Sequence, residues 1–203
     1  MKKIFALLSV LVLLTSVAHA QSRIAVVDLR RVFDNYYKTQ LADANLKDEA
    51  AELEKERKEM IQEIRKSEEE WKKLVDNAND QAISATERDR NKQAAEKKLL
   101  EIRQQRETLE QFELSARAKL GEKHRRKRDA ILEEIRSLIN TRAKAQSYSL
   151  VIDSAAESIN NTPIILFSNG ENDITESILT ELNSSASPSV LKSLEERKAQ
   201  ENK

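Results

Sequence analysis

The sequence contains no cysteine, and its 203 residues include only two glycines and two prolines. The absence of cysteine excludes disulfides, thiolate nucleophiles and sulfur ligands for metals. Aromatic residues make up 4% of the chain, whereas charged residues make up 34%. A chain with so few large apolar side chains cannot form one large hydrophobic core, and its scarcity of helix breakers favours long helices.

A net charge is also lacking, because 35 lysines and arginines balance 35 aspartates and glutamates. This balance argues against a uniformly basic nucleic-acid-binding protein and against a uniformly acidic disordered tail. The charges are nevertheless unevenly distributed. Residues 43–80 carry 8 basic and 13 acidic side chains, whereas residues 86–128 carry 14 basic and 8 acidic ones.

Residues 1–20 have the pattern of a secretory signal peptide. Two lysines follow Met1, residues 4–14 are almost entirely apolar, and Ala18 and Ala20 are the small residues that a signal peptidase reads. The apolar run is shorter than the roughly 20 residues that a membrane-spanning helix requires. We therefore expect cleavage after Ala20 and a soluble mature protein outside the cytoplasm.

Residues 38–147 are expected to form a long antiparallel helical hairpin, a coiled-coil arm. Their apolar residues recur at alternating spacings of three and four, and no proline interrupts them. Ser84 followed by Glu87 fits a capping box that starts a second helix, which places the tip near residues 77–85. Because the outgoing half is acidic and the returning half is basic, the two halves are expected to attract each other.

The heptads of this arm are imperfect, because polar residues occupy some positions that should face the other helix: Arg57, Ser67, Arg106 and Glu113. Polar residues in the seam weaken a coiled coil, which favours flexible arms over a rigid rod. The two arginines are interpreted either as residues that loosen the seam or as partners of acidic neighbours. Trp71 and Phe112 are interpreted either as contacts for a bound partner or as seam residues, and helical spacing favours the seam.

Short strands are predicted on both sides of the arm, at residues 23–28, 148–153 and 163–168. A short amphipathic helix is expected to begin at Asp173. Strands that flank a long hairpin have to meet in one small body. Three short strands cannot bury a sizeable core alone, so we expect other copies of the chain to complete this body.

The predicted domains follow from these elements. The small β body consists of residues 21–37 and 148–183, and the arm of residues 38–147. Residues 184–203 begin with a serine-rich linker and are expected to be a flexible charged tail.

Three parts of this layout are specific enough to carry a resemblance: residues 24–28 followed by Val32 and Phe33, residues 148–153, and Asp173-Ile174-Thr175 downstream. With the charged hairpin between them, they resemble the Skp/OmpH family of periplasmic chaperones over residues 23–182. The resemblance implies a mainly α fold with a small β body. It also implies a homotrimer, in which strands from three subunits form a β-barrel body and three helical hairpins project as tentacles around a cavity.

The resemblance further implies a function and the residues that build the body. The function is that of an ATP-independent periplasmic holdase, which binds unfolded outer-membrane proteins, prevents their aggregation and aids outer-membrane assembly. Carried over by position, the oligomerisation residues are Ile24, Val26, Val27, Phe33, Leu150, Val151 and Ile152. The chain departs from the familiar basic arms, because residues 38–144 carry 26 basic and 24 acidic side chains.

No catalytic constellation is found in the sequence. His124 is the only histidine after the signal peptide, and no glycine-rich phosphate loop occurs. Neighbouring carboxylates on a highly charged helix are expected from composition alone. We therefore expect no enzyme, no catalytic or cofactor-binding residues and no metal site.

A run of basic residues in the returning half has two interpretations: Lys123, Arg125, Arg126, Lys127 and Arg128. It is either an anion-binding site for lipopolysaccharide or anionic lipid, or a solvated helix surface opposite acidic residues. Consecutive helical residues point all round a helix and form no flat recognition surface, which favours the second interpretation. Secretion argues against nucleic acid as a partner.

Two functions remain open from the sequence. The first is the holdase, with unfolded outer-membrane proteins and further copies of the chain as its partners. The alternative is a structural or tethering coiled-coil protein of the cell envelope, whose arms bind one folded partner.

Overall fold

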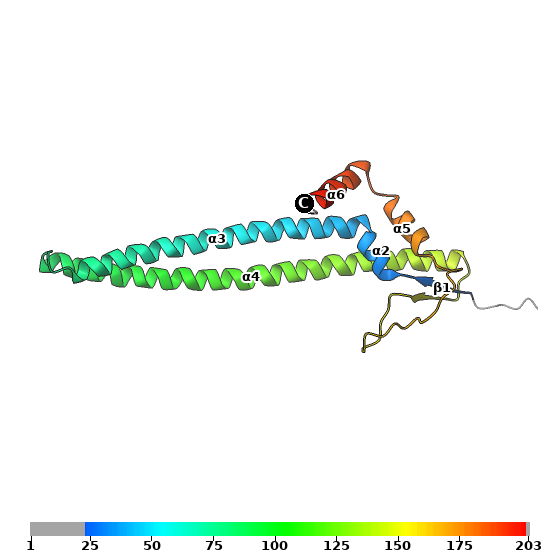
Figure 1. Ribbon diagram of the computed structural model, residues 1–203, viewed down its shortest axis with the longest axis horizontal. Helices are drawn as coiled ribbons and strands as arrows, with labels where there is room; N and C mark the ends of the chain where they lie inside the picture. The colour runs from blue at the N-terminus through cyan, green and yellow to red at the C-terminus, as the bar shows by residue number, and fades with distance from the viewer. Residues whose placement is uncertain (1–22, 202–203) are drawn as a thin grey trace, which may run out of the picture. The chain divides into compact units, whose positions relative to one another are not determined.

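The computed structural model describes residues 23–201, and the chain is mainly helical with one small sheet (Figure 1). The predicted signal peptide lies outside the described residues. The mainly α fold with a small β component is confirmed. The elements, in chain order, are β1 (Ile24–Val27), α2 (Leu29–Asn35), α3 (Tyr37–Asn79), α4 (Ala85–Ala145), β2 (Leu150–Asp153), α5 (Thr175–Asn183) and α6 (Pro188–Glu201).

These elements form two compact units. The body unit consists of residues 23–36 and 133–186, and the arm unit consists of residues 37–132 and 187–201. Helix α4 contributes to both units, because its last turns, from Glu133 onward, belong to the body unit. The body unit therefore holds a helical segment as well as the strands.

The sheet of the body unit joins segments that lie far apart in the sequence. Strands β1 and β2 are parallel, with Ile24 opposite Leu150. On the other side of β1, the N–H of Val26 donates to the carbonyl of Asn172, and the N–H of Ile174 donates to the carbonyl of Val26, both at 3.0 Å. Strand β1 thus lies between two extended segments, and β2 lies at an edge of the sheet.

The third predicted strand, residues 163–168, is wrong for the chain as described. The structure assigns no strand there, and only one antiparallel bridge joins Glu157 to Pro163. Ile164, Leu166 and Phe167 are 56%, 84% and 86% exposed. An apolar, β-branched pattern is not sufficient for a strand, because a strand also needs a neighbour for its backbone hydrogen bonds.

The core of the body unit lies where α2 and α5 pack near the sheet and the end of α4. It includes Tyr36, which is 1% exposed and whose hydroxyl donates to Oε1 of Glu134 (2.9 Å). Each fully buried aliphatic side chain stabilises the fold by about 1.5–3 kcal/mol. The buried apolar residues are Ala25, Val27, Val32, Tyr36, Ile135, Ile139, Ile174, Ile178 and Leu182.

The Asp-Ile-Thr segment before α5 has a structural explanation. The carboxylate of Asp173 accepts the N–H of Thr175 (2.9 Å), and the hydroxyl of Thr175 accepts the N–H of Asp28 (2.9 Å). Asp28 in turn caps α2, because its carboxylate accepts the N–H of Arg31 (2.7 Å). The segment therefore links the start of α5 to the start of α2.

Asp153, the last residue of β2, completes this polar network. One oxygen of its carboxylate accepts the backbone N–H of Leu29 (3.1 Å) and that of Ala155 (3.0 Å). Leu29 is the first residue of α2, so its N–H has no acceptor within that helix. Asp153 thereby binds the end of β2 to the start of α2, which lies 124 residues away in the sequence.

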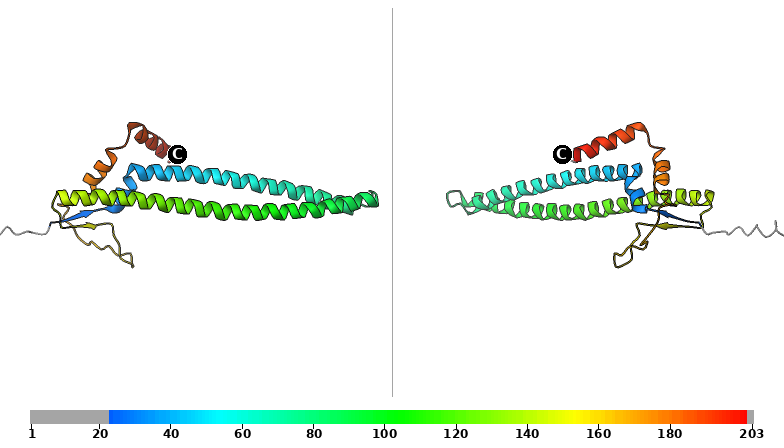
Figure 2. Two further views of the ribbon diagram at one scale, coloured as in Figure 1. Left: turned by 180° about the vertical axis from the view of Figure 1, so that it is seen from behind. Right: turned by 45° about the vertical axis from the view of Figure 1, so that its right-hand side comes forward.

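The arm unit contains two long helices that run side by side in every view (Figure 2). Helix α3 ends at Asn79 and α4 begins at Ala85, so the chain reverses within the predicted tip. The hydroxyl of Ser84 accepts the N–H of Glu87 (3.2 Å), which confirms the predicted N-terminal cap. The long helices therefore begin and end where local side-chain chemistry favours it.

We expect Asp153→Ala to lower the free energy of unfolding of the body unit. The substitution leaves the N–H groups of Leu29 and Ala155 without their acceptor, at a cost of about 1–3 kcal/mol. Urea denaturation followed by near-ultraviolet circular dichroism measures the change, and Glu171→Ala, at an exposed acid of the same unit, is the control. An equal unfolding midpoint for the two variants would contradict the role given to Asp153.

Candidate functional site

Two surfaces are candidates for function, one in each unit. The arm unit has a groove between α3 and α4, bordered by ion pairs. The body unit has exposed apolar side chains on its sheet and on the loop that follows β2.

Ion pairs join the two helices of the arm along its length. Lys98 lies 2.9 Å from Glu70, and Arg106 pairs with Glu68. Nearer the start of α3, Glu49 pairs with Lys123 and lies 3.6 Å from Lys119. All these pairs join an acid on α3 to a base on α4, so the predicted attraction between an acidic and a basic half is confirmed.

One further pair has its base on α3 and its acid on α4. It decides between the two interpretations of Arg57. Arg57 donates to Glu54 on its own helix (2.8 Å) and to Glu113 on α4 (3.3 Å). It is therefore a partner of acidic neighbours. Arg106 is likewise a partner of an acidic neighbour, because it pairs with Glu68 on α3, although its side chain is 65% exposed.

Apolar burial in the seam is sparse. Ile64 and Ile102 are 7% and 4% exposed, and Ser67 is buried at a position where a coiled coil normally has a large apolar residue. Trp71 and Phe112 are both half-buried. Their role as client contacts stays a prediction, and only Phe112 lines the groove described next.

The groove between α3 and α4 is an unfilled part of the seam. It consists of two adjoining cavities of 620 and 540 Å³, which share Ala50, Leu120 and Gly121. Small residues leave it open, and a Cβ added at Gly121 would meet no atom within 4 Å. Its apolar lining residues are Leu46, Ala50, Leu53, Phe112, Ala116 and Leu120.

Ionisable residues border this groove, and two of them, Arg57 and Glu113, form one of the cross-arm pairs. Arg57 and Glu113 line one cavity, whereas Asp43, Lys47 and His124 line the other. The groove is therefore an apolar strip with charges of both signs beside it. Such a surface can contact apolar side chains without strong selection for the charge of the partner.

Ion pairs across the arm and within α3 shift the pKa values of their carboxyl groups. The hydrogen bond from Lys123 holds the pKa of Glu49 below its ordinary value of 4.5, and the hydrogen bond from Arg57 does the same for Glu54. Lys98 likewise lowers the pKa of Glu70, while Glu70 and then Glu101 raise the pKa of Lys98. These carboxylates therefore stay charged under mildly acidic conditions.

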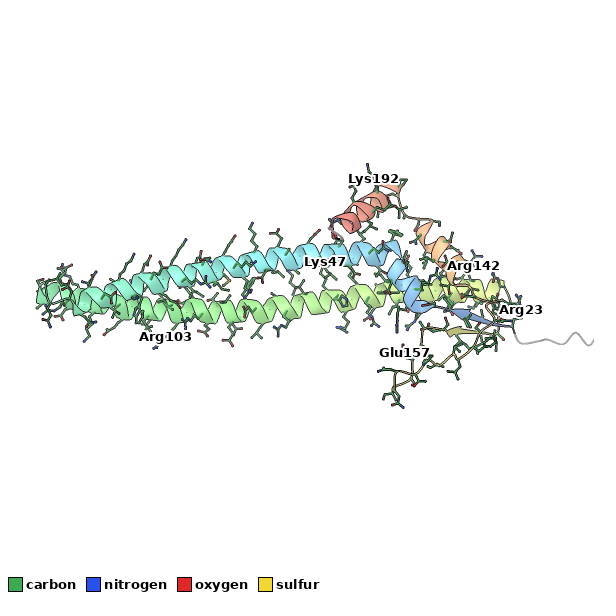
Figure 3. The ribbon with its side chains drawn as sticks, viewed as in Figure 1. Arg23, Lys47, Arg103, Arg142, Glu157 and Lys192 are labelled. Atoms are coloured by element: carbon green, nitrogen blue, oxygen red, sulfur yellow. The ribbon has the colours of Figure 1, made fainter. Side chains whose placement is uncertain are left out.

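The basic run of α4 is partly neutralised within the arm. Lys123 pairs with Glu49, Arg126 lies 3.3 Å from Glu122, and Arg128 lies 3.9 Å from its neighbour Asp129. The other two members, Arg125 and Lys127, are exposed. Figure 3 shows charged side chains standing out from both sides of the arm. Binding of lipopolysaccharide or anionic lipid by this run stays a prediction.

The residues predicted for oligomerisation lie on different faces of the body unit. Ile24 and Leu150, which face each other in the strand pair, are 44% and 50% exposed. Val27, in contrast, is buried in the core of its own chain at 3% exposure. The other members of the predicted set are half-buried: Val26, Phe33, Val151 and Ile152.

The sequence reasoning missed one feature of the body unit, the exposure of the loop after β2. Ile159 is 99% exposed, and Leu166 and Phe167 follow at 84% and 86%. The sequence carries a signal for this feature, because the apolar run at 163–168 predicts a strand. The pattern does not reveal that the described chain pairs this run only at Pro163 and Ile164.

Among residues 23–201, no group of three or more acidic or histidine side chains is placed to hold a metal ion. No helix in this part of the chain is long and apolar enough to cross a membrane.

We expect the thermal stability of the arm helices to fall as the pH drops below 4.5, the ordinary pKa of glutamate. A carboxyl whose pKa is lowered on folding stabilises the folded state above its unfolded pKa, and this contribution is lost as the pH falls through the folded pKa. Thermal melts followed by circular dichroism between about pH 7 and about pH 3 measure the effect.

Glu49→Gln should lower the melting temperature near neutral pH and make its pH dependence shallower, because Lys119 and Lys123 lose their shared partner. Glu59→Gln removes the same charge from an exposed position of α3 and is the control. Identical pH profiles for the two variants would show that the pairs of Glu49 do not stabilise the arm.

The comparisons with known proteins identify the family. A family model described as outer membrane protein (OmpH-like) matches residues 23–182, which is most of the chain. No curated protein matches the chain. The family is one of chaperones for outer-membrane proteins in the periplasm, and not a family of enzymes. The predicted resemblance is thus confirmed, and the chain belongs to the Skp/OmpH family.

Proposed function

We propose that the protein is an ATP-independent periplasmic holdase, which keeps unfolded outer-membrane proteins from aggregating and aids outer-membrane assembly. The family match over residues 23–182 is the observation that carries this proposal. The long two-helix arm supports it, because such an arm offers a large surface on which a client can be held without being folded.

The surface of the arm suits weak and unspecific binding. The apolar groove at Ala50 and Leu120 can receive client side chains, and the incompletely filled seam lets the two helices adjust to different segments. Each contact is weak, and retention comes from many contacts made at once. A client leaves for a more stable destination, so no nucleotide is required.

Electrostatic capture contributes little in this mechanism. Acids of α3 pair with bases of α4, so many of the charges are already neutralised within the arm. Exposed ion pairs and long-range attraction are both screened by salt. Binding through the groove should therefore persist at ionic strengths that would abolish capture by a basic cavity.

We expect the mature protein to suppress aggregation when a denatured porin is diluted from urea with one equivalent of chaperone trimer. Light scattering measures aggregation, at low salt and at about 0.5 M salt, where the Debye length is only a few ångströms. Unchanged aggregation of the porin would rule out the holdase. Capture of one dominant folded partner from envelope extracts would instead support a tether.

A pair of variants tests the groove itself. Ala116→Glu places a charge among its apolar residues and should weaken suppression, whereas Ala130→Glu adds the same charge at an exposed position of α4. Circular dichroism checks that both variants keep their helices. Equal suppression by the two variants would show that clients do not use the groove.

We also propose that three copies of the chain complete the body. The exposed pair Ile24 and Leu150 supports this, and so does the edge position of β2, since an edge strand presents free backbone groups to a further strand. Ile164, Leu166 and Phe167 are exposed and lie in a segment to which the structure assigns no strand. In a trimer, a strand from a second copy would pair with this segment.

We expect sedimentation equilibrium of the mature protein to give the mass of a trimer. Leu150→Asp and Phe167→Asp should each shift the equilibrium toward monomer, because a charge would be buried between copies. Ile159→Asp is the matched control, since Ile159 is equally apolar and even more exposed but lies inside the turn that the hydrogen bond from Asn161 to Ser158 closes. A wild-type monomer would contradict the trimer.

A further inference from the structure

Helix α6 is an element that the family match does not include. The match ends at residue 182, and α6 begins at Pro188 after a short serine-rich linker. In the arm unit α6 lies beside α3, near the start of that long helix (Figures 1 and 2). The arm unit therefore carries a third helix, which lies beyond the residues that the family model matches.

Two contacts hold α6 on α3. Leu194 is 5% exposed, so its side chain is buried where α6 meets α3. One turn further, Nη1 of Arg197 donates to both carboxylate oxygens of Asp48, at 2.9 and 3.2 Å. The opposite side of α6 is solvated. Lys192 points away from α3 and pairs only within α6, with Glu196 at 3.8 Å (Figure 3).

The face of α3 that receives α6 differs from the face that lines the groove. By helical spacing, Asp48 lies opposite Leu46 and Ala50, which face α4. Leu41 and Ala44 share the face of Asp48 and are half-buried, although α4 lies on the other side. This face of α3 therefore combines apolar residues with an acid. On α6, the apolar Leu194 and the basic Arg197 lie one turn apart and complement these two kinds of residue.

The attachment of α6 is weak enough to be reversible. A 14-residue helix is marginally stable alone in water, so α6 depends on its docking. The docking rests on one buried leucine and on one ion pair whose side chains are 47% and 61% exposed, and salt screens such a pair. Docked and undocked forms should therefore interconvert, with populations that respond to ionic strength.

We propose that α6 is a reversible cover for a client-binding face of α3, so that α6 and client exclude each other there. The inference rests on the proposed holdase function. In the free protein α6 shields the apolar residues beside Asp48, and a client displaces it. Because a client must compete with α6, its apparent affinity equals its affinity for the free face multiplied by the fraction of chains in which that face is free.

The first experiment measures docking without any client. Because the chain has no cysteine, spin labels at Glu56→Cys on α3 and Glu195→Cys on α6 are its only thiol labels. Dilution with unlabelled protein restricts the measured distances to single chains. We expect a narrow distance distribution, which broadens and lengthens in Leu194→Ala and in Arg197→Ala but not in the control Lys192→Ala.

A charge exchange tests the ion pair directly. Asp48→Arg alone should undock α6, and combining it with Arg197→Asp should restore the narrow distribution. A broad distribution in the parent protein would overturn the proposal. A narrow distance that disappears on dilution would also overturn it, because α6 would then dock on another copy.

The second experiment measures the affinity of the full-length mature protein for an unfolded porin. If α6 is docked in about nine-tenths of the chains, Leu194→Ala should bind about tenfold more tightly. Lys192→Ala should bind as the parent does. Salt should strengthen binding to the parent by releasing α6, and this effect should be absent in Leu194→Ala.

The outcomes separate the two proposals. Equal affinities for the parent and Leu194→Ala would overturn the role of α6, while suppression of aggregation by both would leave the holdase standing. Failure of every variant to bind or protect porin would overturn the holdase and the competition with it. The spin-label distances would still report whether α6 docks on α3.

Discussion

The fold depends on one constraint, the closure of a very long hairpin by β1, β2 and the residues before α5. The carboxylate of Asp153 accepts the N–H of Leu29, which lies 124 residues away in the sequence. The hydroxyl of Thr175 accepts the N–H of Asp28, which lies 147 residues away. Closing so long a loop carries an entropic cost that grows slowly with its length, so a small set of buried strands and satisfied backbone groups can offset it. The small body unit is therefore where the ends of the arm are joined.

The balance of charges has a different consequence in the arm unit. Acids on α3 meet bases on α4, and each exposed pair contributes little free energy. What the pairs determine is the partner, because a helix of like charge would be repelled, whereas the antiparallel direction follows from the short connection between Asn79 and Ala85. Small residues in the seam, such as Ala50 and Gly121, leave an apolar groove open between the two helices. Because this part of the seam is unfilled, we expect the arm to be less rigid than a regular coiled coil.

Much of this could be predicted from the sequence, wherever the cause is local. Apolar spacing revealed the long helices, Ser84 and Glu87 revealed the turn, and the charge of each half revealed their pairing. Prediction failed where the outcome depends on a distant neighbour. Residues 163–168 have the pattern of a strand, but the structure assigns no strand to them. The sequence could not decide whether Arg106 loosens the seam or pairs with an acid, because its partner Glu68 lies on the other helix. The docking of α6 was not foreseen either, since one leucine and one arginine on a polar segment give no periodic signal.

The features that the sequence could not predict are those in which the single chain leaves its own surface unsatisfied. Ile24, Leu150 and Phe167 stay exposed, and the groove beside Ala116 stays unfilled, at a cost that a protein selected only for stability would avoid. In the function that we propose, a further copy of the chain covers the exposed residues of the body unit, and unfolded clients bind the groove of the arm unit. The polar network around Asp28 and Asp153 fits this division, because all of its hydrogen bonds lie within a single chain and none of them involves the groove of the arm unit.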